Sequence, residues 1–142
     1  MSRLEQVREG VLNHAFYRAC ELSLRHSADG RAEISFAVND FTANPQGALH
    51  GGILYAMMDV ACFFAVVPQL AADQHPVSVE VHTSVLRAAL KGDTVVIRSW
   101  VDRLGRTIAA MRCDALVIEA DGSERLVGTG SVTKSILSGR GR

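Results

Sequence analysis

The sequence predicts an α+β fold in which a curved antiparallel sheet wraps around one long helix. Residues 53–67 form an apolar run that is interrupted by one side chain that is ionised at neutral pH, Asp59. A hairpin signal precedes this run, and four segments with strand character and turn residues between them follow it. A helix that is apolar on nearly all faces must be covered by other structure. A sheet that bends around the helix is therefore the expected architecture.

Turn residues divide the chain into its expected elements. Ala28-Asp29-Gly30 predicts that the strands on either side pair as a hairpin, and Gly92-Asp93 and Asp121-Gly122 are typical of later turns. The four strands after the helix are expected to form a meander. In chain order, we expect a helix at 3–12, strands at 21–27 and 31–38, a loop at 39–48, the long helix from His50–Gly52 to about Val67, and strands at 77–87, 94–102, 106–119 and 124–136.

The strand expected directly after the helix alternates between two kinds of side chain. Period-two alternation predicts that one kind lies on each face of the sheet. The apolar face would carry Val77, Val79, Val81, Thr83 and Val85, and the polar face would carry Ser78, Glu80, His82 and Ser84.

The composition indicates one domain over residues 1–142, with a loose tail at 138–142. Fifteen basic and fifteen acidic residues cancel, so no general field attracts the chain to nucleic acid or to anionic lipid. The N-terminal residues lack the apolar core of a secretion signal, and 53–67 is shorter than the ~20 residues that cross a membrane. We therefore expect neither nucleic acid nor a membrane as a partner.

The cysteines and histidines predict no disulfide framework and no metal site. Cys20, Cys62 and Cys113 are odd in number and form no Cys-x-x-Cys pair. The five histidines show no metal-binding spacing. A reducing, cytoplasmic location fits this pattern best.

Asp59 is a candidate functional residue because of its apolar surroundings. An ionised carboxylate in such surroundings is unfavourable by several kcal/mol unless it is paired or hydrogen-bonded, about 2–7 kcal/mol even for a neutral polar group. The residues alone leave a structural role open, because Asp59 could pair with Arg18 or Arg87. The glycines of the preceding loop, 44–52, could likewise serve only to allow a tight turn.

The loop and the helix together carry an ordered pattern, Asn44-x-x-Gly47-x-x-His50-Gly51-Gly52 followed by Asp59. This pattern resembles the signature of the hotdog-fold acyl-CoA thioesterases, in the branch related to the phenylacetic-acid-degradation thioesterases. Residues 77–93 are similar to the strand and turn that follow the helix in that family, and the likeness covers roughly residues 14–136. The resemblance implies hydrolysis of an aryl-acyl or medium-chain acyl-CoA by a homodimer or homotetramer. Coenzyme A would be part of the substrate, with no other cofactor.

The resemblance also implies roles for individual residues. The backbone N–H of Gly51 would polarise the thioester carbonyl, and Asp59 would attack the carbonyl carbon or activate water. Asn44 would help to hold the water or the carbonyl, Ser78 would assist the water, and His50 would shape the loop by hydrogen bonding. Contacts to the substrate are expected from Gly47, Gly52, Phe63, Arg87 and Lys91.

The spacing of Gly51 and Asp59 predicts that two chains share each site. Eight residues separate them, which is about 12 Å along a helix that rises ~1.5 Å per residue. One chain therefore cannot place both groups on one carbonyl. Two antiparallel helices across a dimer would bring Gly51 of one copy to Asp59 of the other.

Two other functions remain open at this point. The chain could be an acyl-CoA-binding module that keeps the pocket without turnover. It could also be an enoyl-CoA hydratase or dehydratase on the same fold, although no matching arrangement of a histidine and an acid is visible.

Overall fold

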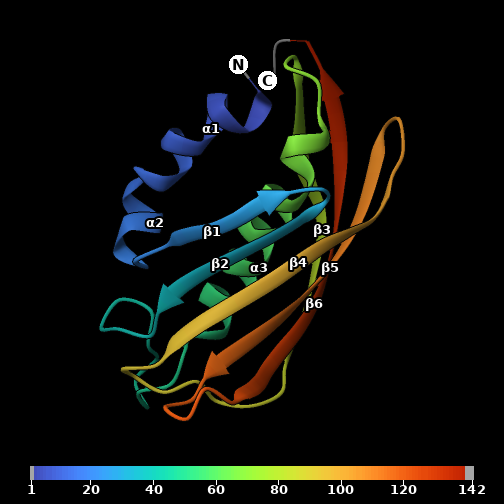
Figure 1. Ribbon diagram of the computed structural model, residues 1–142. Coiled ribbons are helices and arrows are strands. Elements are labelled where there is room, and N and C mark those ends of the chain that lie inside the picture. The colour runs from blue at the N-terminus through green and yellow to red at the C-terminus, as the bar shows by residue number, and fades with distance from the viewer. Residues whose placement is uncertain (1, 140–142) are drawn as a thin grey trace.

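The computed structural model of the chain describes residues 2–139 and shows one curved sheet with a long helix in its concave face (Figure 1). The predicted α+β architecture is confirmed. The helices are α1 Arg3–Leu12, α2 Ala15–Ala19 and α3 Gly51–Val66, and α3 continues into a 3₁₀ turn, η1 Val67–Gln69. The strands are β1 Ser23–Ala28, β2 Arg31–Ala37, β3 Gln74–Val85, β4 Thr94–Leu104, β5 Ile108–Ile118 and β6 Glu124–Ser138.

Local signals explain where the first elements begin and end. A capping box starts α1, in which the Ser2 hydroxyl accepts from Glu5 N at 3.1 Å and the Glu5 carboxylate accepts from Ser2 N at 2.7 Å. The hairpin of β1 and β2 is confirmed, and it turns at Asp29 and Gly30, which both have positive φ. The short helix α2 was not predicted. Of the predicted tail at 138–142, Ser138 belongs to β6 and residues 140–142 lie outside the described part of the chain.

The strand order of the sheet is β1-β2-β4-β5-β6-β3, so the prediction that all four later strands form a meander is wrong. Strands β4, β5 and β6 do form one, but β3 pairs with β6 at the far edge and β2 pairs with β4. The reason lies in α3, which crosses the concave face and carries the chain from β2 to the opposite edge of the sheet. The loop over 86–93 then returns the chain to β2. Neighbours in sequence are therefore not neighbours in the sheet at these two places.

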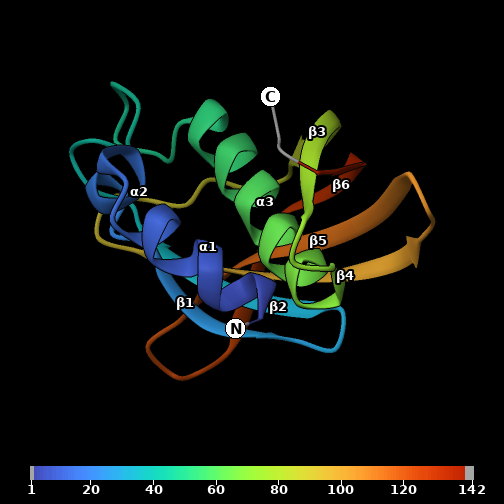
Figure 2. The ribbon, with the colours of Figure 1, turned by 90° about the horizontal axis from the view of Figure 1, so that it is seen from above.

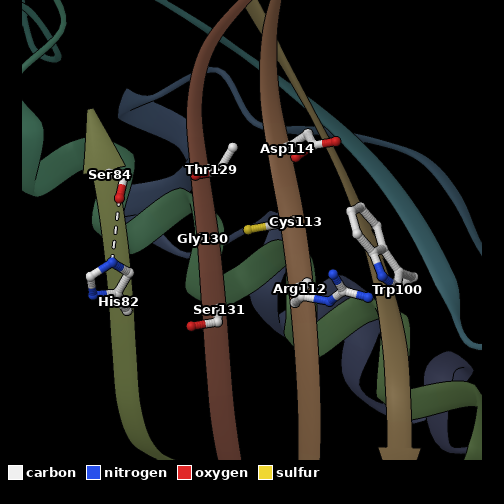
Figure 3. A pocket seen from close by; sticks show the side chains of 9 residues that line it. All are labelled: His82, Ser84, Trp100, Arg112, Cys113, Asp114, Thr129, Gly130 and Ser131. Atoms are coloured by element: carbon white, nitrogen blue, oxygen red, sulfur yellow. Dashed lines mark hydrogen bonds between the residues drawn. The ribbon is translucent and has the colours of Figure 1, made fainter. Parts of the chain in front are cut away.

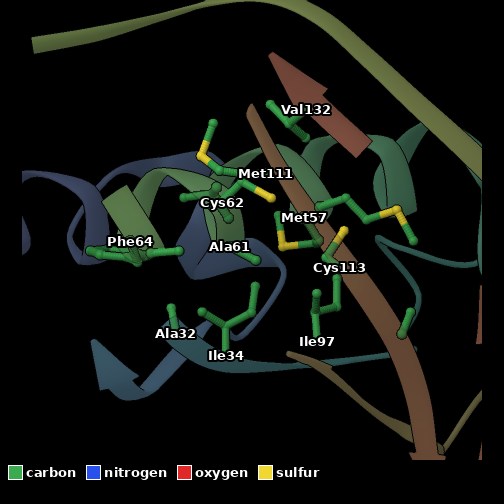
Figure 4. Close-up of a cluster of buried hydrophobic side chains, with 14 of the residues drawn as sticks. Ala32, Ile34, Met57, Ala61, Cys62, Phe64, Ile97, Met111, Cys113 and Val132 are labelled. Carbon is green, nitrogen blue, oxygen red and sulfur yellow. The ribbon is translucent and has the colours of Figure 1, made fainter. Parts of the chain in front are cut away.

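The core lies between α3 and the concave face of the sheet. Buried side chains from the helix and from four strands interlock there, as Figure 4 shows for Ile34, Met57, Ala61, Ile97, Met111, Cys113 and Val132. By length and composition the stretch Gly51–Gln69 could cross a membrane, but 56% of that window is buried inside the fold. Figure 2 shows α3 lying against the sheet, with α1 beside the η1 turn at the C-terminal end of the helix. The apolar stretch is therefore the core helix of this fold.

One face of α3 is open, which the apolar sequence of the helix did not predict. Tyr55, Asp59 and Phe63 are four residues apart, so they lie on the same face. The side chain of Tyr55 is 47% exposed, and those of Asp59 and Phe63 are half-buried. The chain therefore covers α3 incompletely and leaves its acid accessible.

Candidate functional site

A β-bulge turns Ser78 toward the helix. The register of β3 against β6 shifts between Ser78 and Glu80, so Val79 is an extra residue in the strand. After the bulge, Val81 packs against the core, whereas Val79 is 63% exposed. Before the bulge the inward position belongs to Ser78, whose hydroxyl reaches α3. The predicted alternation, which placed Val77 and Val79 on the same face as Val81, is therefore wrong in this part of the strand.

Two donors bind one oxygen of the Asp59 carboxylate. Ser78 Oγ donates to Asp59 Oδ1 at 2.6 Å, and Lys134 Nζ donates to the same oxygen at 2.7 Å. Lys134 Nζ also donates to Ser78 Oγ at 2.9 Å. Oδ2 accepts no hydrogen bond from residues 2–139. Asp59 therefore pairs with Lys134, and the alternative pairing with Arg18 or Arg87 is wrong.

A cavity of about 210 Å³ lies beside this carboxylate. Its walls come from the N-terminal helices, α3, β3 and β6, and consist of Val11, Tyr17, Asp59, Val60, Phe63, Pro76, Ser78 and Lys134. Burial, and next the charge of Asp59, raise the pKa of Tyr17 above its ordinary value. The phenol thus stays protonated at neutral pH and can donate a hydrogen bond. The cavity combines apolar walls with the hydrogen-bonded side chains of Asp59, Ser78 and Lys134.

The start of α3 presents an unused backbone donor. His50 is the N-cap, and its Nδ1 accepts from Gly52 N at 2.9 Å. Gly52 is one of the residues predicted to contact substrate, and this hydrogen bond occupies its N–H. The N–H of Gly51 is exposed and makes no hydrogen bond within residues 2–139. A free N–H at a helix N-terminus can stabilise negative charge on an oxygen.

Asn44 stabilises the loop before α3 through its side-chain carbonyl oxygen. Its Oδ1 accepts from the backbone N–H groups of Gln46 and Ala48, both at 3.0 Å. Its NH₂ group donates no hydrogen bond within the described residues. Gly47 has a φ of +84°, which favours glycine, so this residue supports the turn of the loop.

Asn44 and Arg87 line a second hollow of about 350 Å³, together with Ala48, Leu49, Val85, Leu86 and Ala88. This hollow shares no lining residue with the cavity beside Asp59. Lys91 lines neither and pairs with Asp40 at the surface. The fold thus places Asp59, Ser78 and Phe63 in one group and Asn44 and Arg87 in another.

A third hollow, of about 340 Å³, lies on the outer face of the sheet and contains none of the candidate residues. Figure 3 shows the side chains of His82, Trp100 and Arg112 projecting there from three strands. The Arg112 guanidinium donates to both oxygens of Asp102, at 2.6 and 3.0 Å. Because this hollow contains no candidate residue and the charge of Arg112 is already paired, we place the candidate site on the concave side.

Lys134 is the site residue that the sequence interpretation missed. It lies on β6 opposite Ser78, and its neighbours at alternate positions, Val132 and Ile136, are buried in the core. In a strand whose alternate side chains are apolar, a lysine at one of those positions indicates a candidate functional residue, as an acid in an apolar helix does. The pattern of β6 could therefore have identified it.

Comparisons with known proteins identify similar sequences and structures. Residues 46–119, just over half of the chain, match the thioesterase superfamily. A Deinococcus radiodurans protein named as an esterase is 35% identical over 81 residues, which are 57% of this chain and 53% of that protein. The chain therefore spans about half the length of the curated relative it matches.

Solved structures share the fold over nearly the whole chain. A thioesterase family protein of Silicibacter pomeroyi has a TM-score of 0.87 at 23% identity, covering 97% of this chain and 100% of that one. A variant of the phenylacetic acid degradation protein PaaI of Thermus thermophilus has a TM-score of 0.74 at 25% identity, covering 86% and 98%. A Streptococcus pneumoniae hypothetical thioesterase, solved with coenzyme A, has a TM-score of 0.78 at 20% identity, covering 95% and 99%. The predicted resemblance to hotdog thioesterases, PaaI included, is confirmed.

Proposed function

Because the chain belongs to the thioesterase superfamily, we propose that it hydrolyses an acyl-coenzyme A thioester to a free acid and coenzyme A. The observation that carries the proposal is the Asp59 carboxylate, which lies beside a cavity. Its Oδ1 is bound by Ser78 and Lys134, and its Oδ2 accepts no hydrogen bond from residues 2–139. The coenzyme A in the Streptococcus pneumoniae structure supports the choice of thioester.

The reaction adds water to the carbonyl carbon and breaks the C–S bond. Negative charge develops on the carbonyl oxygen, and the free N–H of Gly51 is the donor suited to it; one such donor is typically worth about 3–4 kcal/mol. A thiol has a pKa of about 8.5, so it leaves without a strong general acid, and the proton taken from water passes to the sulfur. Asp59 Oδ2 either accepts that proton or attacks the carbon itself.

A second copy of the chain would complete each site. Within one helix, Gly51 and Asp59 lie about 12 Å apart along the axis. Two antiparallel α3 helices would bring Gly51 and Asn44 of one copy to Asp59 and Ser78 of the other. The open face of α3 supports this arrangement, because it leaves the acid accessible to another chain.

The lining of the cavity beside Asp59 suits an aryl-acyl or medium-chain acyl group. Tyr17 and Phe63 supply aromatic walls, and Val11 and Val60 supply aliphatic ones. Arg87 is exposed at the hollow next to Asn44, where it could contact the phosphates of coenzyme A. Three buried free cysteines fit a cytoplasmic location.

Release of free thiol from a panel of aryl-acyl and fatty-acyl-CoAs tests the proposal. Asp59→Asn keeps the size of the side chain but removes its charge, and we expect turnover to fall by about 10²–10⁴-fold. Asp73→Asn, in an exposed loop, is the matched control and should behave as wild type.

Three results would overturn the proposal. Asp59→Asn could retain full turnover, which would exclude the acid from the reaction. Calorimetry could show tight acyl-CoA binding without hydrolysis, which would favour the binding module. Hydration of an enoyl-CoA without thiol release would favour the hydratase.

A further inference from the structure

Lys134 is a charged residue at a core position of β6. It is 3% exposed, and the adjacent inward residues, Val132 and Ile136, are apolar. An ammonium in such a place is unfavourable unless it is paired. Even a paired one is often no more stabilising than well-packed apolar side chains of similar volume. Stability alone therefore does not account for a lysine here.

The contacts of Lys134 form a closed triangle with Ser78 and Asp59. Both donors of the triangle meet at the same carboxylate oxygen, Oδ1, at 2.6 Å from Ser78 Oγ and 2.7 Å from Lys134 Nζ. The side chain of Lys134 is 4% exposed and that of Asp59 is 32% exposed. The ammonium thus lies behind the carboxylate, and the acid faces the accessible side.

The hydrogen bonds of the triangle also use the only proton of the Ser78 hydroxyl. Its one O–H donates to Asp59, and its oxygen accepts from Lys134 at 2.9 Å. A hydroxyl carries a single proton, so Ser78 has none left to donate to a water. In this chain Ser78 therefore acts on Asp59, which differs from the role that the family resemblance implied.

We propose that Lys134 is a positioning residue that selects the reactive oxygen of Asp59. With Ser78 it binds Oδ1 and stops rotation of the carboxylate, which leaves Oδ2 for the water or the thioester. This inference rests on the proposed function and adds a residue that lies outside the Asn44–Asp59 pattern.

Lys134 is a cation in direct contact with Asp59. Tyr17 on α2 and Cys62 on α3 also interact with this acid. Burial raises the pKa of Tyr17, and a hydrogen bond with Cys113 together with burial raises that of Cys62. Both stay neutral near pH 7, so of these three groups Lys134 supplies the positive charge.

Two variants separate the charge of Lys134 from its hydrogen bond. Lys134→Met removes both, and we expect kcat to fall about 10²-fold because the carboxylate is misplaced, with KM little changed. Lys134→Gln keeps an N–H donor without charge and should retain part of kcat. In both variants the loss should fall on kcat and leave KM little changed. Arg112→Met, which breaks an ion pair on the outer face of the same sheet, is the control and should change neither.

The outcomes distinguish this inference from the proposed function. Unfolding in urea checks that each variant folds. If Lys134→Met does not fold, Lys134→Gln alone tests the inference. The ¹³C chemical shift of the Asp59 carboxyl needs no turnover to measure, and it should differ from wild type in both variants because the hydrogen bond from the Lys134 ammonium to Oδ1 is changed. An active wild type with unchanged kcat and unchanged chemical shift in the variants would overturn the role of Lys134 and leave the thioesterase intact. An inactive wild type would overturn the thioesterase, and the chemical shift would still decide the role of Lys134.

Discussion

Gly51 and Gly52 are adjacent glycines whose N–H groups have different partners. His50 Nδ1 accepts the N–H of Gly52, and a Cβ added at Gly52 would lie 3.1 Å from the His50 ring. A Cβ added at Gly51 would meet no atom within 4 Å in the same chain. At Gly51 the feature that matters is therefore the backbone N–H. At Gly52 the lack of a side chain matters as well, because it leaves room for the His50 ring.

Gly51→Pro and Gly51→Ala test the backbone donor. Proline lacks the N–H and is well tolerated at the first position of a helix, and His50 already has the extended conformation that proline prefers before it. We expect Gly51→Pro to fold and to lose about 10²–10³-fold in kcat, because one oxyanion donor is gone. Gly51→Ala keeps the donor and should retain activity well above that of Gly51→Pro. Equal kcat values in the two variants would contradict the role of the N–H.

At the scale of elements, α3 depends on its first turn. The helix is apolar and has no acidic residue in that turn, and the His50 side chain satisfies one of its N-terminal donors, the N–H of Gly52. The His50 carbonyl also accepts from the backbone N–H groups of Ile53 and Leu54, at 3.0 and 3.2 Å. The cap therefore both starts the helix and orients the exposed N–H of Gly51.

His50→Ala should lower the free energy of unfolding by about 1 kcal/mol, because the N–H of Gly52 loses its acceptor. His50→Asn replaces one N-cap by another and should keep most of this stability. Urea unfolding monitored by circular dichroism measures both variants. If His50→Ala is as stable as wild type, the bond seen at the helix start contributes nothing to folding.

At the scale of the whole molecule, the open face of α3 and strand β3 are the surfaces that a second copy would cover. Strand β3 lies at the edge of the sheet and exposes Val77 and Val79, at 44% and 63%. An exposed apolar edge strand is normally paired or protected. The same side of the molecule carries Asp59, so assembly and completion of the site would be one event.

Mixed dimers test whether two chains share each site. Asp59→Asn and Gly51→Pro are each expected to inactivate a homodimer. Co-assembled, they leave one site with both native groups and one site with neither, so about half of the wild-type activity per dimer should return if the two symmetric sites act independently. Differently tagged chains and tandem purification isolate the mixed species. Mixed dimers that form but stay inactive would show that each chain carries its own complete site.

The correct predictions from the sequence concern short-range patterns. Helix α1, the first hairpin, the long α3 and the strand positions each follow from periodicity and turn residues within one segment. The candidate role of Asp59 and of the loop pattern before it also comes from local sequence, and it stays a prediction. The errors concern pairing between distant segments, namely the place of β3 beside β6 and the face on which Val79 lies.

By itself the sequence determined the elements, the buried character of α3 and the candidate acid within it, because spacing along the chain decides these features. Only the tertiary structure decided what surrounds the acid. Lys134 and Ser78 lie 75 and 19 residues from Asp59 in sequence, and they meet it because β3 crosses to the far edge and a bulge turns Ser78 inward. Strand register is a long-range choice, and one extra residue reverses which side chains face the site.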